Sequence, residues 1–109
     1  MAKSYKVLGQ SNPSATSATT LYTVPSATQT VVSSITICNL AATDATYRIA
    51  IRPDAETLAN KHYISYDSTI PANDTIGLTL GVTANAADVV TVYASTASVA
   101  FNIFGSEIA

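Results

Sequence analysis

The only histidine in this chain of 109 residues, His62, is the side chain best suited to general-base chemistry near neutral pH. It lies beside Tyr63 in the segment HYISYD. A hydrolytic triad needs such a base next to a nucleophilic hydroxyl. Serine and threonine are so frequent here that some hydroxyl will lie near His62 by chance. We therefore interpret His62 as a surface or interface histidine, and we predict a protein that is not an enzyme and has no catalytic residue.

The acidic residues do not show the spacing of a catalytic carboxylate pair or of a metal site. The candidates are all seven acidic residues: Asp44, Asp54, Glu56, Asp67, Asp74, Asp88 and Glu107. Most of these seven lie in turn-like stretches, where aspartate bonds to nearby backbone. His62 and Asp67 could bind calcium or zinc only with ligands from elsewhere, because no ligand spacing repeats. The lone Cys38 excludes an internal disulfide, and its apolar neighbours indicate a small buried side chain. We predict no metal and no cofactor.

The composition excludes several classes of partner. Charged residues make up 11% of the chain, less than half of the usual share of about 25%. The net charge is −2 without a basic cluster, so we expect no nucleic-acid partner. No segment approaches the roughly 20 apolar residues of a membrane helix, and the first ten residues, MAKSYKVLGQ, lack the apolar run of a signal peptide. We expect synthesis in a cytoplasm, no membrane partner, and a weakly charged surface that packs against neighbours.

Short segments with a two-residue alternation dominate the chain and predict an all-β fold. The predicted strands are 3–9, 21–24, 30–40, 45–52, 62–67, 75–80 and the two strands of a hairpin over 89–105. Only 53–60 could form a helical turn, with Asp54 as its cap. About seven or eight strands at this spacing predict an antiparallel β-sandwich, jelly-roll or Ig-like. Residues 21–109 would form the sandwich, and residues 1–20 a strand with a Ser/Thr/Ala-rich linker or arm.

The alternation also predicts which side chains point inward. The segment 30–40 is apolar on both sides, with Val31, Ile35 and Ile37 on one face and Val32, Cys38 and Leu40 on the other. Such a strand is central, or one of its faces meets another subunit. In 45–52 the inward side chains are Tyr47, Ile49 and Ile51, and the basic side chains Arg48 and Arg52 point outward. In 75–80 the inward side chains are Ile76, Leu78 and Leu80.

Tyrosines and outward basic side chains are the candidates for an interface, because Tyr and Arg are enriched where proteins meet. The interface candidates are Tyr47, Arg48, Arg52, His62, Tyr63, Tyr66 and Tyr93. Tyr63 and Tyr66 are expected on opposite faces of one strand. Arg48, Arg52 and Lys61 could form a small basic ridge. A sugar platform built from Tyr63, Tyr66 or Tyr93 is the alternative, and the lack of tryptophan in the sequence disfavours it.

Six segments follow one another in a recognisable order: LYTVP, SSITICNL, YRIAIRP, NKHYISYD, PANDT and VVTVYASTASVAFNIFG. Over about residues 21–108, this succession resembles small virion structural proteins of tailed bacteriophages, cyanophages included. The resemblance implies a non-enzymatic β-domain of the virion, assembled in the host cytoplasm. Its place would be the head surface, as a decoration or cement protein, or the neck or tail. The resemblance offers no active-site motif, and residues 1–20 lie outside it.

The expected partners follow from the low charge and from the sheet edges. An exposed edge strand must be paired, covered or charged, and so few charges favour pairing with another subunit. We therefore expect a closed homo-oligomer such as a trimer, together with binding to other virion proteins of the capsid or tail. The alternative is a glycan-binding adhesion module of a tail fibre.

Overall fold

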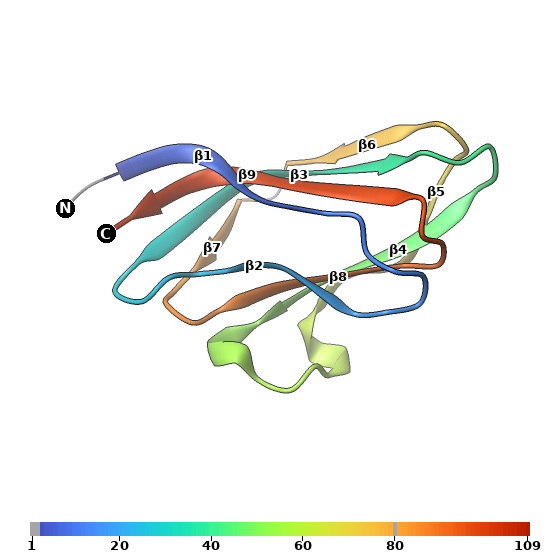
Figure 1. Ribbon diagram of the computed structural model, residues 1–109. Helices are drawn as coiled ribbons and strands as arrows, with labels where there is room; N and C mark the ends of the chain where they lie inside the picture. Colours follow the sequence, from blue (N-terminus) through green and yellow to red (C-terminus); the bar gives the residue numbers. More distant parts are fainter. Residues whose placement is uncertain (1–2, 80) are drawn as a thin grey trace.

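The protein is a sandwich of two antiparallel β-sheets (Figure 1). The computed structural model describes residues 3–79 and 81–109, and these residues form nine strands and two short 3-10 turns. The all-β sandwich predicted from the alternation is confirmed. The strand count exceeds the prediction because β7 (Val82–Ala84) lies outside the predicted strands. Leu80, predicted to point inward, lies outside the described residues.

One sheet, here called sheet I, contains the longest strands. Its order is β1 (Lys3–Ser11), β9 (Val99–Ile108), β3 (Gln29–Asn39) and β6 (Thr75–Leu78), with β7 pairing the other end of β3. The stretch expected as a linker or arm stays against the sandwich. The Asn12 side chain donates to the carbonyl of Val99 at 2.8 Å, and the backbone N–H of Thr16 donates to Ala94 at 2.8 Å.

The other sheet, sheet II, has the order β2 (Thr19–Thr23), β8 (Val89–Ala94), β4 (Ala45–Arg52) and β5 (Tyr63–Ile70). The predicted hairpin over 89–105 is therefore wrong, because β8 and β9 belong to different sheets. Their apolar faces meet across the core, so the connection 95–98 crosses from one sheet to the other. Its two ends are held by the bond from the Ser95 N–H to Thr46 (2.9 Å) and the bond from the Leu40 N–H to Ser98 (2.8 Å).

The core lies between the sheets and is filled by inward side chains from both. Its largest fully buried members include Phe101, Ile35, Ile37, Ile49 and Ile103. Tyr47 packs against Phe101 edge to face, with ring centroids 6.4 Å apart. Burial of these side chains is the main favourable contribution to folding. The inward prediction for Tyr47 and Ile49 is confirmed.

Two β-bulges in sheet I change which side chains point outward. The pairing with β9 shifts between Val7 and Gly9 of β1 and between Val32 and Ser34 of β3. An extra residue in one strand reverses the alternation beyond it. Val31 is therefore 37% exposed, whereas Ile35, predicted on the same face, is fully buried.

The other side of the 30–40 prediction changes for the same reason. Val32 is buried with the core, whereas Cys38 is only half-buried and Leu40 is 63% exposed. Val32 pairs with Gly105, where the strands approach closely. A Cβ at Gly105 would lie 2.1 Å from the carbonyl oxygen of Val31, so this position accepts only glycine without a backbone shift.

The segment between β4 and β5, here called the 53–62 loop, lies below sheet II in Figure 1. It contains the 3-10 turns η1 (Pro53–Ala55) and η2 (Asn60–His62) rather than one α-helical turn. Asp54 does not cap a turn with its side chain. It lies inside η1 at φ 54°, and its backbone N–H donates to the Asp88 carboxylate at 2.9 Å.

Candidate functional site

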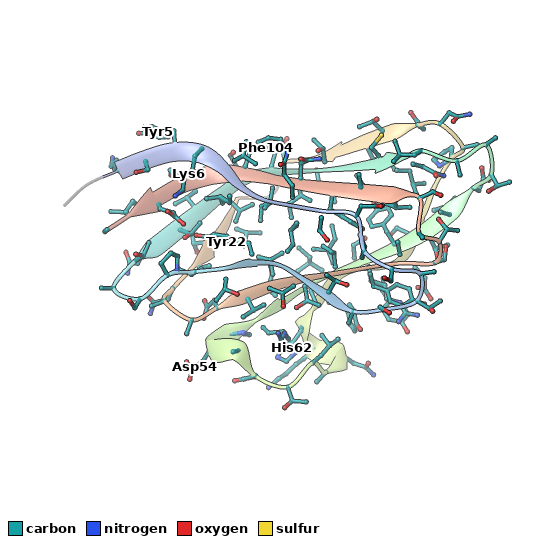
Figure 2. All side chains as sticks on the ribbon, viewed as in Figure 1. Tyr5, Lys6, Tyr22, Asp54, His62 and Phe104 are labelled. Carbon is teal, nitrogen blue, oxygen red and sulfur yellow. The ribbon has the colours of Figure 1, made fainter. Side chains whose placement is uncertain are left out.

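An apolar surface occupies the outer face of sheet I, on the side away from sheet II. We call it the apolar patch, and it consists of Tyr5, Val7, Val31, Phe104 and Ile108. The strand register brings these residues together, since Val7 pairs with Phe104, and Tyr5 and Val31 both pair with Ser106. Tyr5 is 78% exposed and Val7 48% exposed. Figure 2 shows Tyr5 and Phe104 on this side of the sandwich.

The apolar patch surrounds a shallow hollow and carries little charge. The hollow has a volume of about 400 Å³ and is lined by Tyr5, Lys6, Val31, Phe104 and their neighbours. Among the described strand residues that the register places on this face, Lys3 is the only charged one, and Lys6 is paired with Glu107. A partner could therefore cover this face while removing few ionised groups from water, which is costly.

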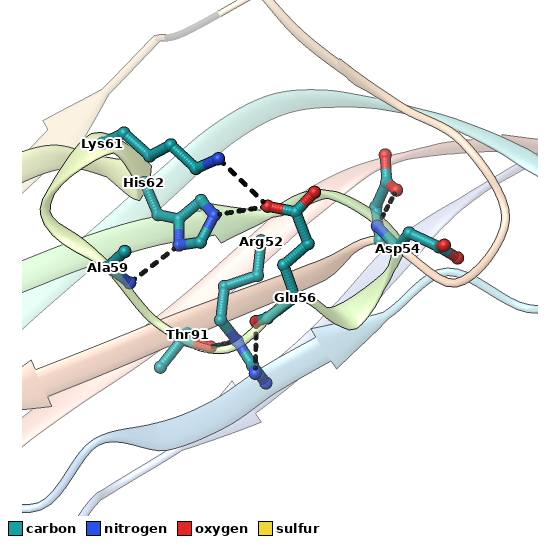
Figure 3. Close-up of polar contacts among 8 residues, drawn as sticks. Arg52, Asp54, Glu56, Ala59, Lys61, His62 and Thr91 are labelled. Carbon is teal, nitrogen blue, oxygen red and sulfur yellow. Dashed lines mark hydrogen bonds and ion pairs between the residues drawn. The ribbon is translucent and has the colours of Figure 1, made fainter.

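The outer face of sheet II is different because the 53–62 loop covers part of it. Arg52 holds the loop to the sheet: its Nε donates to Thr91 Oγ1 at 3.0 Å, and its Nη1 donates to the carbonyl of Glu56 at 3.0 Å (Figure 3). Thr91 and Ala50 lie beneath the loop, with 6% and 1% exposure although their register points them away from the core.

His62 lies inside this loop and is only 4% exposed, so the prediction of a surface or interface histidine is wrong. Its Nδ1 accepts the backbone N–H of Ala59 at 3.0 Å, which leaves the ring proton on Nε2 to be donated to Glu56 at 3.2 Å. The bond from His62 and the nearby charge of Lys61 hold the pKa of the Glu56 carboxyl below its usual value. Both ring nitrogens thus close the loop (Figure 3).

Beyond the loop, the same face presents a group that we call the tyrosine–arginine cluster, consisting of Arg48, Tyr63, Tyr66, Asp67 and Tyr93. The guanidinium carbon of Arg48 lies 4.2 Å from the ring centroid of Tyr66 and 4.1 Å from that of Tyr93. Arg48 Nε donates to Asp67 at 2.7 Å, and this bond raises the pKa of the guanidinium. The Tyr63 and Tyr66 rings meet edge to face at 4.8 Å.

The contact between Tyr63 and Tyr66 contradicts the prediction that they occupy opposite faces of one strand. The pairing of β4 with β5 is irregular here, because Tyr47 pairs with Ser68 whereas Ile49 pairs with Ser65. A second register shift follows, because Ala50 pairs with Tyr63 although Ile49 pairs with Ser65. The extra residue between Tyr63 and Ser65 puts Tyr63 on the same face as Tyr66, and sequence alternation alone could not reveal it.

The remaining interface candidates have structural roles in this chain. Tyr47, at 4% exposure, lies in the core and offers no surface to a partner. The predicted basic ridge is already paired internally, because Arg48 contacts Asp67, Lys61 lies 3.5 Å from Glu56, and Arg52 anchors the 53–62 loop. Sequence reasoning missed the apolar patch, because the bulge that exposes Val31 leaves no signal in the sequence.

A buried polar group links the two sheets at one end of the sandwich. Tyr22 donates to Glu107 Oε2 at 2.5 Å and lies 2.7 Å from the hydroxyl of Thr30, while Lys6 lies 2.7 Å from the other carboxylate oxygen. Burial and then the bond to Glu107 raise the pKa of Tyr22 to about 12. The bonds from Lys6 and Tyr22 lower the pKa of Glu107. Figure 2 shows Tyr22 between the sheets.

Within residues 3–79 and 81–109, no three His, Cys, Asp or Glu side chains gather as a metal-ion site, and no helix is long and apolar enough to cross a membrane. In comparisons with known proteins, the chain matches no family model and no curated protein.

Proposed function

We propose that this chain is a non-enzymatic structural protein of a tailed-phage virion, which self-associates and docks on the particle through the apolar patch. The observation that carries the proposal is the exposure of Tyr5, Val7 and Val31 on one nearly uncharged sheet face. The resemblance of the segments over residues 21–108 supplies the setting, as head decoration, neck or tail component.

The apolar patch suits a protein partner better than a small molecule. Contiguous apolar side chains of several strands, bordered by small polar ones, are typical of surfaces that other proteins cover. β1 also forms one edge of sheet I, and strand edges readily pair with another chain.

Two charge insertions test this proposal. We expect the wild-type protein to form an oligomer, measured by size-exclusion chromatography with light scattering, and to co-sediment with particles of the encoding phage. Val7→Asp and Val31→Asp should each weaken self-association and particle binding by about ten-fold or more, since each places a charge where a partner must exclude water. Both side chains are exposed, so neither variant should unfold.

Ile64→Asp on β5 is the matched control, because Ile64 is 46% exposed, against 48% for Val7, but lies in sheet II. It should assemble and co-sediment like the wild type. A wild-type protein that stays monomeric and does not co-sediment with particles would overturn the proposal. Equal losses of assembly and co-sedimentation in Ile64→Asp and Val7→Asp would overturn it too.

A further inference from the structure

The tyrosine–arginine cluster borders an open cavity of its own on sheet II. The cavity has a volume of about 330 Å³ and is lined by Asn60 of η2 and by Tyr63 and Tyr66 of β5. It lies on the opposite outer face from the apolar patch. We infer that this cavity binds a neutral saccharide, a function beyond the docking proposed for sheet I.

The aromatic walls of the cavity are held in place before any ligand arrives. The Tyr63 and Tyr66 rings meet at an interplanar angle of 79°, and Arg48 packs against Tyr66 while bonded to Asp67. Tyr66 nevertheless remains 55% exposed. Ordering two exposed aromatic side chains on binding would cost affinity, so rings already fixed by neighbours are suited to recognition.

The backbone beneath the cluster is strained in a way that a simple strand does not need. Asp67 adopts φ 49°, in the left-handed region, in one irregularity of β5, and a second register shift between Tyr63 and Ser65 places Tyr63 on the same face as Tyr66. Left-handed conformations carry an energetic cost, and both they and bulges are concentrated where a side chain has to be held in a particular direction. Here the two irregularities direct Tyr63 and Tyr66.

The chemistry of the lining matches the two sides of a sugar ring. A pyranose has a face of C–H groups that packs on an aromatic ring, and a rim of hydroxyls that needs donors and acceptors. Tyr63 and Tyr66 supply ring surface and phenolic hydroxyls, and the Asn60 side chain supplies both a carbonyl acceptor and N–H donors. One small cavity therefore offers both kinds of contact.

The local charge favours a neutral ligand over an anionic one. Asp67 offsets Arg48, and Glu56 offsets Lys61, which follows Asn60 in η2. A phosphate or sulfate would have to compete with these carboxylates for its cation. The open shape suits one face of a polysaccharide lying across the surface, so we expect a dissociation constant of about 1 mM for one site, with higher avidity where many copies are presented together.

The test uses a printed array of neutral and anionic oligosaccharides, followed by NMR titration of maltohexaose, cellohexaose and a hyaluronan hexasaccharide. We expect a neutral oligosaccharide to bind and to shift amide signals around Asn60, Tyr63 and Tyr66. Tyr66→Ala and Asn60→Ala should weaken binding by about ten-fold, and circular dichroism checks that each variant is folded.

Tyr5→Ala is the matched control, because it removes an exposed tyrosine from the other sheet; it should leave the dissociation constant of a single site, measured by the NMR titration, within about two-fold of wild type. A blank array overturns the inference, as does binding confined to anionic sugars or a single-site affinity equally reduced in Tyr5→Ala. Shifts at this cavity caused only by a peptide would identify a protein-docking site instead and would equally overturn it. The oligomeric state tests sheet I separately, so the two proposals fail independently.

Discussion

The two outer faces of this sandwich are completed in different ways. On sheet II, the 53–62 loop covers one part of the face, and the ion pair of Arg48 and Asp67 joins the tyrosines on another. On sheet I, Tyr5, Val7 and Val31 remain exposed, and no segment within the described residues is folded over them. Sheet II satisfies most of its polar groups within the chain, whereas sheet I leaves apolar surface for another molecule.

The two faces differ in how their polar groups are satisfied. On sheet II, Arg48 pairs with Asp67, Lys61 pairs with Glu56, and Arg52 bonds to Thr91 and to the carbonyl of Glu56, and the loop supplies its own cover. No described segment covers the apolar patch, so its contact with water is unfavourable in proportion to the exposed apolar area. Substitutions can separate the features that shape sheet I from those that cover sheet II.

The largest effect is expected at Gly105, where β9 passes β3 beneath the apolar patch. In Gly105→Ala the new Cβ would lie 2.1 Å from the carbonyl oxygen of Val31, so the strands must separate. We expect a loss of about 3 kcal/mol in the free energy of unfolding, measured by urea denaturation.

Gly77→Ala in β6 is the control on the same sheet, because a Cβ added at Gly77 would meet no other atom within 4 Å. It should change the free energy of unfolding by less than about 1 kcal/mol. Equal effects of Gly77→Ala and Gly105→Ala would show that close strand approach does not shape sheet I.

A smaller loss is expected when the cover of sheet II is opened. His62→Ala removes the acceptor of the Ala59 N–H and a buried ring. We expect a loss of about 2 kcal/mol in the free energy of unfolding, with faster hydrogen exchange at Ala59 by NMR.

Lys61→Ala is the neighbouring control: its side chain is 73% exposed, and the change should stay within about 0.5 kcal/mol. If His62→Ala is as stable as Lys61→Ala, the histidine does not hold the loop on the sheet.

The smallest effect at neutral pH concerns Tyr22, which joins both sheets through Glu107 and Thr30. Tyr22→Phe should cost about 1 kcal/mol at pH 7. The pKa of Tyr22 is raised from 10.0 to about 12, so the unfolded chain loses this proton first. The contribution of the Tyr22 hydroxyl to the free energy of unfolding is therefore fully present below pH 10 and is lost as the pH rises towards 12.

Denaturation curves between pH 7 and 12 measure this dependence. The difference between the wild type and Tyr22→Phe should shrink as the pH passes 10. A difference that stays constant over this interval would contradict the raised pKa of the buried hydroxyl.

Regular alternation predicted the parts of the fold where pairing is regular. In β4 it correctly placed Tyr47 and Ile49 inside and Arg48 outside, because each residue there faces the side that its parity requires. It failed at the bulges: one extra residue in β3 exposes Val31, and the irregularity in β5 joins Tyr66 to Tyr63. Bulges depend on the neighbouring strand, which a single strand's sequence does not contain.

The connection between β8 and β9 and the burial of His62 failed for a related reason. Two adjacent alternating segments look alike whether they pair with each other or face each other across a core, so the sequence predicted a hairpin. His62 showed the alternation of a strand, but the two turns of the 53–62 loop fold it against sheet II. Long-range packing decided both cases.

The position of β9 has a consequence for synthesis on the ribosome. Sheet II needs only strands that precede Ser95, so all of its strands leave the ribosome before β9 and it can form first. Sheet I cannot, because β1 and β3 are both joined to β9, the ninth strand in chain order. Until β9 emerges, β3 lacks its main partner, and such delayed long-range pairing makes folding slow and exposes nascent chains to aggregation. We therefore expect chaperones to bind this protein through β1 and β3.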